Sequence, residues 1–247
     1  MNRTLYILLL SAITCLAGSC KKDTTKPDAP ALAYLMMYNG SPEYFGQNST
    51  ALVNNADYGT RNYNDHGGGL IGAFSFSRYS YIDTGIYRLA FTDAAYQAGH
   101  GAKLAETWLH FNNQQHYTIY LTDSLGYYTI LSTQDDVAPD EQQAKIRLVH
   151  LSPDAGKVSL HLGTVAVKPI SQVGFKEVTG YVAVQPDIKP GIRIIYNDPQ
   201  TGEETMLIRK SFPMEAGKCY TMVLRGYRTA PDGNINKTIN LSTITNF

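Results

Sequence analysis

The sequence predicts an all-β protein with two tandem immunoglobulin-like antiparallel β-sandwich domains. Three observations support this prediction: short segments alternate apolar and polar residues, turn-forming residues recur between those segments, and an ordered set of features occurs twice along the chain. Alternation with a period of two is typical of strands with one buried face, and the abundant Tyr, Thr, Val and Ile suit pleated surfaces. About 100 residues with many short strands is the size of one small sandwich.

The first 30 residues are expected to direct export rather than to fold. Residues 1–19 have a basic start, an apolar stretch and a small-residue exit, which is the layout of a secretory signal. Their apolar part is shorter than the roughly 20 residues that a membrane-spanning helix needs. Residues 17–20, Ala-Gly-Ser-Cys, resemble a bacterial lipobox, so we expect Cys20 to carry lipid and to begin the mature protein. Residues 20–30 are polar with two prolines, which favours an extended tether.

A lipid on Cys20 would hold the protein at a membrane outside the cytoplasm. Lys21 follows Cys20, so the acidic residue that resembles an inner-membrane retention signal is absent, and we expect the outer membrane. Display at the cell surface is the favoured location, and the periplasmic face is the alternative, because a tether serves either side. The expected partners are the membrane, through the N-terminal lipid, and a glycan or an envelope protein.

The rest of the chain divides at an acidic stretch with one proline, residues 134–143. This stretch separates a first domain, residues 31–135, from a second domain, residues 144–247, and the order of landmarks in the two indicates an internal repeat. A helix is compatible only with residues 92–109, where two glycines weaken the pattern. The paired landmarks are Ser41-Pro42 with Ser152-Pro153, Tyr81-Ile82 with Tyr181-Val182, Gly85-Ile86 with Gly191-Ile192, Tyr117-Thr118 with Tyr220-Thr221, and Leu131-Ser132-Thr133 with Leu241-Ser242-Thr243.

Within this repeat, Tyr117 and Tyr220 each start a strand after a turn. That position is typical of the tyrosine corner of immunoglobulin-type sandwiches, where the hydroxyl bonds to backbone a few residues upstream. We therefore expect both tyrosines to have a structural role.

The second domain resembles a known family. Residues 149–155, Val-His-Leu-Ser-Pro-Asp-Ala, together with Tyr181 and residues 190–191 and 216–221, resemble the bacterial family of the domain of unknown function 4397. The resemblance covers about residues 144–246, and the first domain resembles a diverged copy that keeps residues 41–42, Ser-Pro, without the Asp-Ala that follows. The resemblance implies an immunoglobulin-like sandwich on secreted or surface proteins and implies no activity.

Composition excludes some classes of function. The chain carries 21 basic and 21 acidic residues, a balance that gives no general attraction to nucleic acid, so we expect no nucleic-acid partner. The three cysteines are Cys15, Cys20 and Cys219. Because Cys15 leaves with the signal and Cys20 carries lipid, Cys219 has no partner within the chain, and we expect a buried, inert thiol.

No group of residues predicts catalysis, a metal or a cofactor. His150, Ser152 and Asp154 have the residue types of a hydrolytic triad. However, Ser-Pro-Asp is also a common turn sequence, in which Pro fixes the second position and Ser and Asp bond to nearby backbone, so we expect a structural role. Residues 67–72 fit the glycine spacing of a dinucleotide loop without the required strand before and helix after. His110 and His116 lack a third ligand nearby in the sequence, so we expect no zinc site.

One stretch, residues 54–66, carries the expected ligand contacts. It combines amide, carboxylate and aromatic groups, which suit sugar recognition or the oxygen ligation of a hard cation. An ordinary loop is the alternative, because Asn, Asp and Gly are common in loops. The expected ligand-binding residues are Tyr58, Arg61, Tyr63, Asp65 and His66.

The sequence therefore predicts a membrane-anchored envelope lipoprotein that acts as a non-catalytic binding, adhesion or structural module. The alternative is a secreted glycan hydrolase with a carboxylate pair in the groove between the domains. Such an enzyme needs two carboxyl groups roughly 5–10 Å apart. The available acids are Glu106, Asp123, Glu177 and Glu203.

Overall fold

The computed structural model describes residues 30–61, 63–64, 66–67, 79–96 and 101–246. Contacts divide the chain into Met1–Pro30 and one compact unit, Ala31–Phe247. The predicted signal, the lipid site at Cys20 and nearly all of the tether therefore lie outside the described residues. In the described part of the chain, no helix has the length and apolar character required to cross a bilayer.

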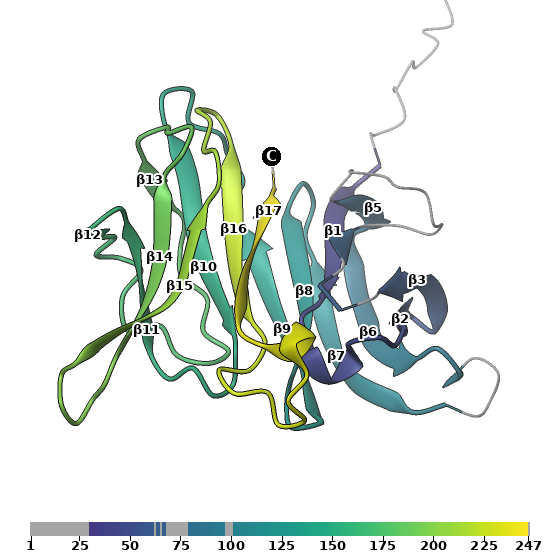
Figure 1. Ribbon diagram of the computed structural model, residues 1–247. Helices are drawn as coiled ribbons and strands as arrows, with labels where there is room; N and C mark the ends of the chain where they lie inside the picture. Colours follow the sequence, from purple (N-terminus) through teal and green to yellow (C-terminus); the bar gives the residue numbers. More distant parts are fainter. Residues whose placement is uncertain (1–29, 62, 65, 68–78, 97–100, 247) are drawn as a thin grey trace, which may run out of the picture. The chain divides into compact units, whose positions relative to one another are not determined.

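The first half of the compact unit forms two sheets (Figure 1). One sheet has the order β4-β1-β8-β9, with β5 also paired to β1, and the other has the order β3-β2-β6-β7. A short 3-10 helix, η1 (Pro42–Tyr44), follows β1. The strands are β1 (Leu32–Asn39), β2 (Ser49–Val53), β3 (Ala56–Arg61), β4 (His66–Gly67), β5 (Ser80–Asp83), β6 (Gly85–Asp93), β7 (Lys103–Phe111), β8 (His116–Ser124) and β9 (Tyr127–Asp135).

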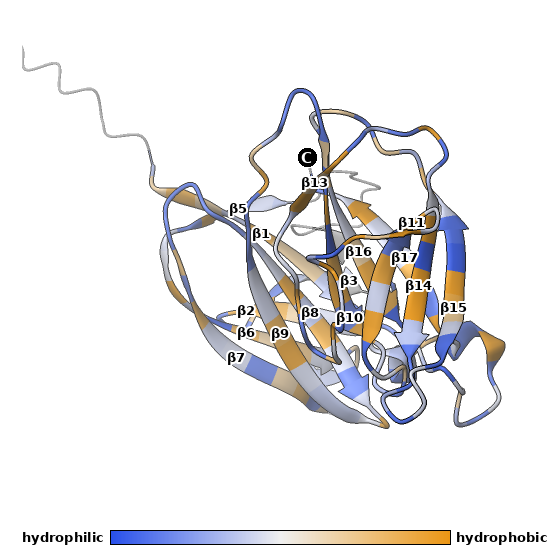
Figure 2. Cartoon of the chain, turned by 90° about the vertical axis from the view of Figure 1, so that its left-hand side faces the viewer, coloured by the Kyte–Doolittle hydropathy of each residue, from blue (hydrophilic) through white to orange (hydrophobic). Residues whose placement is uncertain are grey.

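The second half also forms two sheets, with the orders β13-β10-β16-β17 and β12-β11-β14-β15. Strand β15 is hydrophobic in its middle and hydrophilic toward both ends (Figure 2). A 3-10 helix, η3 (Ile235–Lys237), precedes the last strand. The strands are β10 (Ala144–Leu151), β11 (Val158–Leu162), β12 (Val165–Ala166), β13 (Val182–Val184), β14 (Gly191–Asn197), β15 (Glu204–Ser211), β16 (Cys219–Arg225) and β17 (Asn240–Thr245).

The two halves repeat one topology, and the all-β prediction is confirmed. Strands β5, β1, β8 and β9 correspond in order and pairing to β13, β10, β16 and β17. Two details differ from the sequence predictions. Each half contains one parallel pair, in which Leu35 lies opposite Tyr117 and Ile146 lies opposite Tyr220. The window considered for a helix, residues 92–109, instead contains the end of β6 and most of β7, which pair as antiparallel neighbours.

Each half encloses its own apolar core between its two sheets. Leu35 and Met37 of β1 face the first core, and Ile146 and Leu148 of β10 face the second. Because side chains alternate between the two faces of a strand, the residues between them point to the opposite face. That opposite face is also buried in both halves.

The outer faces of the β1 and β10 sheets meet at a third apolar cluster, which we call the seam. Strand β1 is buried on both faces over Leu35-Met36-Met37-Tyr38. A strand with two buried faces carries a continuous apolar run instead of an alternating one. Gly40 borders the seam, where a Cβ atom would lie 2.5 Å from Leu151 Cδ1. The buried seam residues are Met36, Tyr38, Tyr120, Val149, Leu151, Val223 and Ile244.

The two predicted tyrosine corners are present. The Tyr117 hydroxyl accepts a hydrogen bond of 3.2 Å from the backbone N–H of Asn112. The Tyr220 hydroxyl accepts one of 3.0 Å from the backbone N–H of Glu215. In both cases the partner lies five residues upstream, so the same local device closes the turn before β8 and before β16.

The predicted linker is a short connection along the surface of the unit. Val137 is 6% exposed, and Asp140 forms an isolated bridge with Gln143. Asp135, inside the predicted linker, is buried at the end of β9. Separate folding of the two halves stays a prediction, and an isolated half would expose its face of the seam.

Candidate functional site

The residues predicted to contact a ligand have different surroundings. Tyr58 on β3 is 9% exposed and packs in the first core, where its hydroxyl donates a 3.1 Å hydrogen bond to a backbone carbonyl of β1. Tyr63, just after β3, lies at the boundary between the two halves. Asp65 and the side chains of Arg61 and His66 lie outside the described residues. The structure thus separates Tyr58, which supports the core, from Tyr63.

Asn64 connects Tyr63 to the second half. Its backbone has a φ of +66°, a conformation that Asn tolerates better than most residues. Its side-chain oxygen accepts hydrogen bonds from the Tyr38 hydroxyl (2.8 Å), the Ser242 hydroxyl (2.6 Å) and Nε of Arg225 (3.0 Å). The Arg225 guanidinium lies over the Tyr63 ring, 4.7 Å from its centroid. These contacts fix the loop after β3 against β16 and β17.

The same residues line a hollow of about 300 Å³, which we call the seam cleft. Phe45 is 37% exposed and Ile235 is 78% exposed, so apolar surface is available at the cleft. The Phe45 and Tyr63 rings meet edge to face with centroids 6.3 Å apart. The cleft is lined by Phe45, Tyr63, Asn64, Arg225, Ile235, Asn236, Thr238 and Asn240.

An ion-pair cluster holds the two sides of the seam cleft together. Lys237 of η3 pairs with Glu43 of η1 at 3.1 Å and with Asp232 at 2.8 Å. The Asn234 side chain caps η3 by accepting a 3.0 Å hydrogen bond from the backbone N–H of Asn236. Because η1 belongs to the first half and η3 to the second, the Lys237–Glu43 ion pair joins the two halves beside the cleft.

A second hollow of about 350 Å³, which we call the basic pocket, shares Asn64 and Arg225 with the seam cleft. It lies along β15 and β17. Its lining residues are Asn64, Lys210, Ser211, Phe212, Arg225, Leu241, Ser242 and Thr243.

A third hollow, of about 550 Å³, lies beside the linker and is a weaker candidate. Three of its polar side chains already have partners in the protein: Gln134 donates a 2.6 Å hydrogen bond to Gln115, and Asp135 pairs with Arg147 in the seam. The seam cleft and the basic pocket are therefore the candidate ligand site. The third hollow is lined by Gln114, Gln115, His116, Gln134, Asp135, Asp136, Val137, Ala138 and Pro139.

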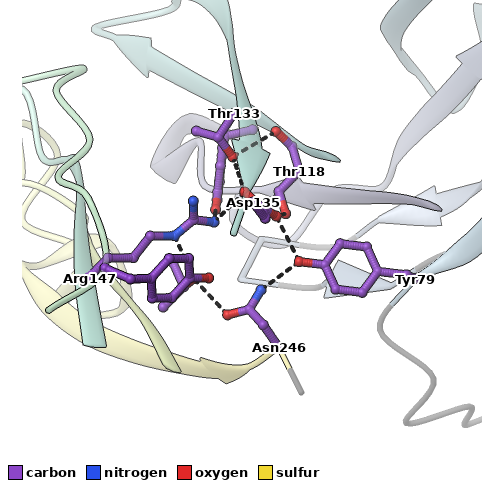
Figure 3. A network of polar contacts seen from close by, with 9 residues as sticks. Tyr79, Thr118, Thr133, Asp135, Arg147 and Asn246 are labelled. Carbon is purple, nitrogen blue, oxygen red and sulfur yellow. Dashed lines mark hydrogen bonds and ion pairs between the residues drawn. The ribbon is translucent and has the colours of Figure 1, made fainter. Parts of the chain in front are cut away.

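The polar part of the seam centres on Asp135 of β9 and Arg147 of β10, whose ion pair measures 2.7 Å (Figure 3). The two side chains are 0% and 3% exposed. Asp135 also accepts hydrogen bonds from the hydroxyls of Thr118, Thr133 (2.6 Å) and Tyr79 (2.7 Å). This carboxylate therefore has a partner on every side.

Arg147 is equally well engaged. Its Nε donates to the Thr221 hydroxyl (2.8 Å) and a terminal amino group donates to the Tyr120 hydroxyl (3.2 Å). Burial opposes the charge of Arg147, but Tyr120 and the facing carboxylate raise its pKa above the ordinary value. The Asn246 amide closes the network by accepting from Thr221 (2.7 Å) and donating to Tyr79 (2.8 Å). A buried network with these partners positions the two halves and leaves little for a ligand.

The triad-like residues bind backbone groups. A ring nitrogen of His150 lies 2.9 Å from the Gly156 carbonyl, and the Ser152 hydroxyl donates to the Gly226 carbonyl at 2.5 Å. Asp154 accepts from two backbone N–H groups of the loop after β16. His150 therefore binds its own turn, whereas Ser152 and Asp154 bind backbone of the loop after β16 instead of the nearby backbone that a Ser-Pro-Asp turn predicts. All three side chains have structural partners.

The four acids considered for a hydrolase lie on different elements. Glu106 of β7 is ion-paired with Lys103 at 2.6 Å. Asp123, at the end of β8, is fully buried and accepts a 2.8 Å hydroxyl hydrogen bond across the seam. Glu177 and Glu203 are exposed in loops of the second half. Among the described residues, no two of these four carboxylates share a hydrogen bond or an ion-pair partner.

The two histidines considered for zinc occupy β7 and the start of β8. His116 stacks on Tyr34 with ring centroids 4.2 Å apart, and burial lowers its pKa despite the opposing effect of Asp135. The described part of the chain contains no group of three His, Cys, Asp or Glu side chains placed to hold a metal ion.

A family model described as a domain of unknown function (DUF4397) matches residues 33–161, just over half of the chain. The chain belongs to this family. The DUF4397 match covers the first half together with β10 and β11. It thus falls mainly on the half in which the sequence resemblance was weaker.

Beyond DUF4397, no curated protein matches the chain. Among solved structures, a proposed cell adhesion protein from Bacteroides uniformis ATCC 8492 is 10% identical, with a TM-score of 0.24, and the match covers 87% of this chain and 98% of that one. A family CBM26 module of Eubacterium rectale Amy13K, solved with maltoheptaose, is 13% identical with a TM-score of 0.24, and the match covers 82% and 99%.

Sequence reasoning missed most of the candidate site. Neither Arg225 nor Lys210 was considered. Arg225 was the more visible of the two, because it is the only charged residue of the buried strand β16. Phe45, just after the Ser-Pro turn, was also missed. Only Tyr63 was found, through the mixture of amide and aromatic residues around it.

Proposed function

We propose that the chain is a non-catalytic binding module of the bacterial envelope that takes a carbohydrate ligand in the seam cleft. The observation that carries this proposal is the cleft itself, in which the exposed faces of Phe45 and Ile235 stand beside the amides of Asn64, Asn236 and Asn240. Sugars present apolar faces and hydroxyl groups together, so apolar surface beside amides matches their chemistry. Residues of both halves build the cleft, and the ion pairs around it preorganise it.

The proposal places the module outside the cytoplasm, on a lipid attached to Cys20. The signal-like residues 1–19 and the lipobox-like residues that end at Cys20 support this location. The polar residues 20–30 would separate the compact unit from the lipid surface. We propose the outer face of the outer membrane, with the periplasmic face as the alternative.

A glycan array probed with the full chain in detergent tests the binding function. We expect binding to at least one oligosaccharide class, and a loss of about tenfold in affinity, or about 1.4 kcal/mol, in Phe45→Ala and in Ile235→Ser. Tyr81→Ala is the matched control, because Tyr81 is a 70% exposed aromatic residue that lines neither hollow. Equal losses in all three variants, or no binding to any glycan, would contradict the proposal.

Fatty-acid labelling tests the anchor. We expect wild-type chain to incorporate label and Cys20→Ser to incorporate none, whereas equal labelling would exclude Cys20 as the lipid site. Protease treatment of intact cells then tests the face of the membrane. Cleavage near Asp140 on whole cells supports the surface, and cleavage only after lysis supports the periplasmic face.

The alternative function, glycan hydrolysis, predicts that the bound glycan is cleaved. A hydrolase would release new reducing ends from a bound oligosaccharide, and replacing the responsible acid would abolish release. Glu106, Asp123, Glu177 and Glu203 lie on separate elements, so we expect no release by wild-type chain. Turnover that is lost in one of their amide variants would establish this alternative.

A further inference from the structure

Arg225 is a buried cation without a described counter-charge. The residue is 9% exposed, and none of the ion pairs among the described residues includes it. Its hydrogen-bond acceptors, Asn64 and Ser242, are neutral and both meet Nε. The neighbouring Tyr63 ring is neutral as well, since burial raises its pKa despite the lowering effect of Arg225. Arg147, the other buried seam arginine, has a carboxylate partner instead.

A second cation lines the same pocket. Lys210 of β15 donates a 2.6 Å hydrogen bond to the Leu241 carbonyl and belongs to no ion pair within the described part of the chain. Burial lowers its pKa, and the positive charge of Arg225 lowers it further. Two cations that face one hollow repel each other, and a bound anion would relieve both the repulsion and the desolvation of Arg225.

The basic pocket adjoins the proposed sugar site. Asn64 and Arg225 line both hollows, so a ligand on Phe45 in the seam cleft can extend a charged group toward Arg225. The hydroxyls of Ser242 and Thr243 add further hydrogen-bonding groups to the pocket. The planar guanidinium fork matches the geometry of a carboxylate.

We propose that the basic pocket binds the carboxylate of an acidic sugar, with Arg225 and Lys210 as its charge partners. This inference rests on the proposed function and specifies its ligand class as a glycan that contains uronic acid. Other sugar rings of the same glycan would occupy the seam cleft, and one uronic acid unit would place its carboxylate in the basic pocket.

Calorimetric titration of the full chain with trigalacturonate, and with its methyl ester, tests the proposal. Esterification removes the charge and keeps the sugar rings, so the two ligands form a matched pair. We expect the acid to bind about tenfold more tightly than the ester at low ionic strength, with the difference shrinking as salt is added.

Three variants assign the preference to the pocket. Lys210→Gln removes one charge from an exposed residue and is expected to reduce acid binding several-fold with little effect on the ester. Arg225→Lys keeps the charge and loses the fork, so it should lose part of the preference. Lys189→Gln, at an exposed lysine that lines neither hollow, is the matched control and should bind as wild type.

The outcomes separate this inference from the proposed function. If acid and ester bind equally well, the carboxylate site is wrong and the sugar site stands. If neither ligand binds and the chain binds no glycan on the array, the carboxylate site and the sugar site are both wrong. Asp65 lies outside the described residues, so Asp65→Asn is included. A preference for the acid that arises only in Asp65→Asn would assign the counter-charge to Asp65 and overturn the inference.

Discussion

Asp135 is the residue whose replacement tests the architecture of the seam most sharply. Its carboxylate pairs with Arg147 at 2.7 Å and accepts three hydroxyl hydrogen bonds. The substitution Asp135→Ala removes all of these acceptors. It leaves the Arg147 guanidinium, 3% exposed, with only neutral partners.

The expected loss of stability is large. Removing one partner of a buried ion pair costs about 3–5 kcal/mol, because the remaining charge stays desolvated. Folded domains are stable by only about 5–15 kcal/mol, so this is a substantial fraction of the total. With an m-value of about 2.5 kcal/mol/M, a loss of about 4 kcal/mol lowers the urea midpoint by about 1.6 M. Urea unfolding followed by tyrosine fluorescence measures the shift.

Two further variants make the interpretation specific. Asp136→Ala is the neighbouring control: its side chain is 76% exposed and lies 3.7 Å from Lys145, so we expect a change within about 0.5 kcal/mol. Asp135→Leu combined with Arg147→Met removes both charges and should recover part of the loss. If Asp135→Ala unfolds within about 1 kcal/mol of wild type, the buried ion pair does not hold the seam together. A double variant less stable than Asp135→Ala would lead to the same conclusion.

Three other predictions concern the two halves. Tyr117→Phe and Tyr220→Phe should each lower the free energy of unfolding in urea by about 1 kcal/mol, because each loses its corner hydrogen bond. Tyr81→Phe on β5 is the exposed control, and equal losses in all three variants would contradict the corner assignment. Burial lowers the pKa of His116 below its ordinary 6.5, partly opposed by Asp135, so the folded state binds fewer protons there than the unfolded state. Stability should therefore fall as pH drops from 6.5 toward that lowered pKa, and His116→Gln should flatten part of the fall, whereas an unchanged pH profile would contradict it. Cys219 is buried and its thiol pKa is raised by burial, so a thiol reagent should label it only in guanidinium, and rapid labelling of native chain would contradict the burial.

The strands and the repeat follow from local patterns in the sequence. Alternation along β11 and at the start of β10, and the turn residues between strands, depend only on neighbours in the chain. The tyrosine corners at Tyr117 and Tyr220 are also local, since each hydroxyl meets a backbone group five residues away. Short-range physics therefore made the all-β class and the paired landmarks predictable.

The seam and the site depend on contacts that sequence reasoning does not supply. Arg225 meets Asn64 from 161 residues away, and that meeting exists only because the outer faces of two sheets pack together. The visible sign was the continuous apolar run Leu35-Met36-Met37-Tyr38, which indicates a strand buried on both faces. The parallel pairing of β1 with β8 was likewise hidden, because alternation alone does not give strand direction.

Two-dimensional NMR of the isotope-labelled full chain, titrated with the oligosaccharide that the glycan array selects, locates the bound ligand residue by residue. We expect the largest amide shift changes at residues of both hollows, Asn64, Arg225 and Asn236, with little change at Tyr81 on β5. Shift changes centred on β5, or confined to one half away from the seam cleft, would contradict the proposed site.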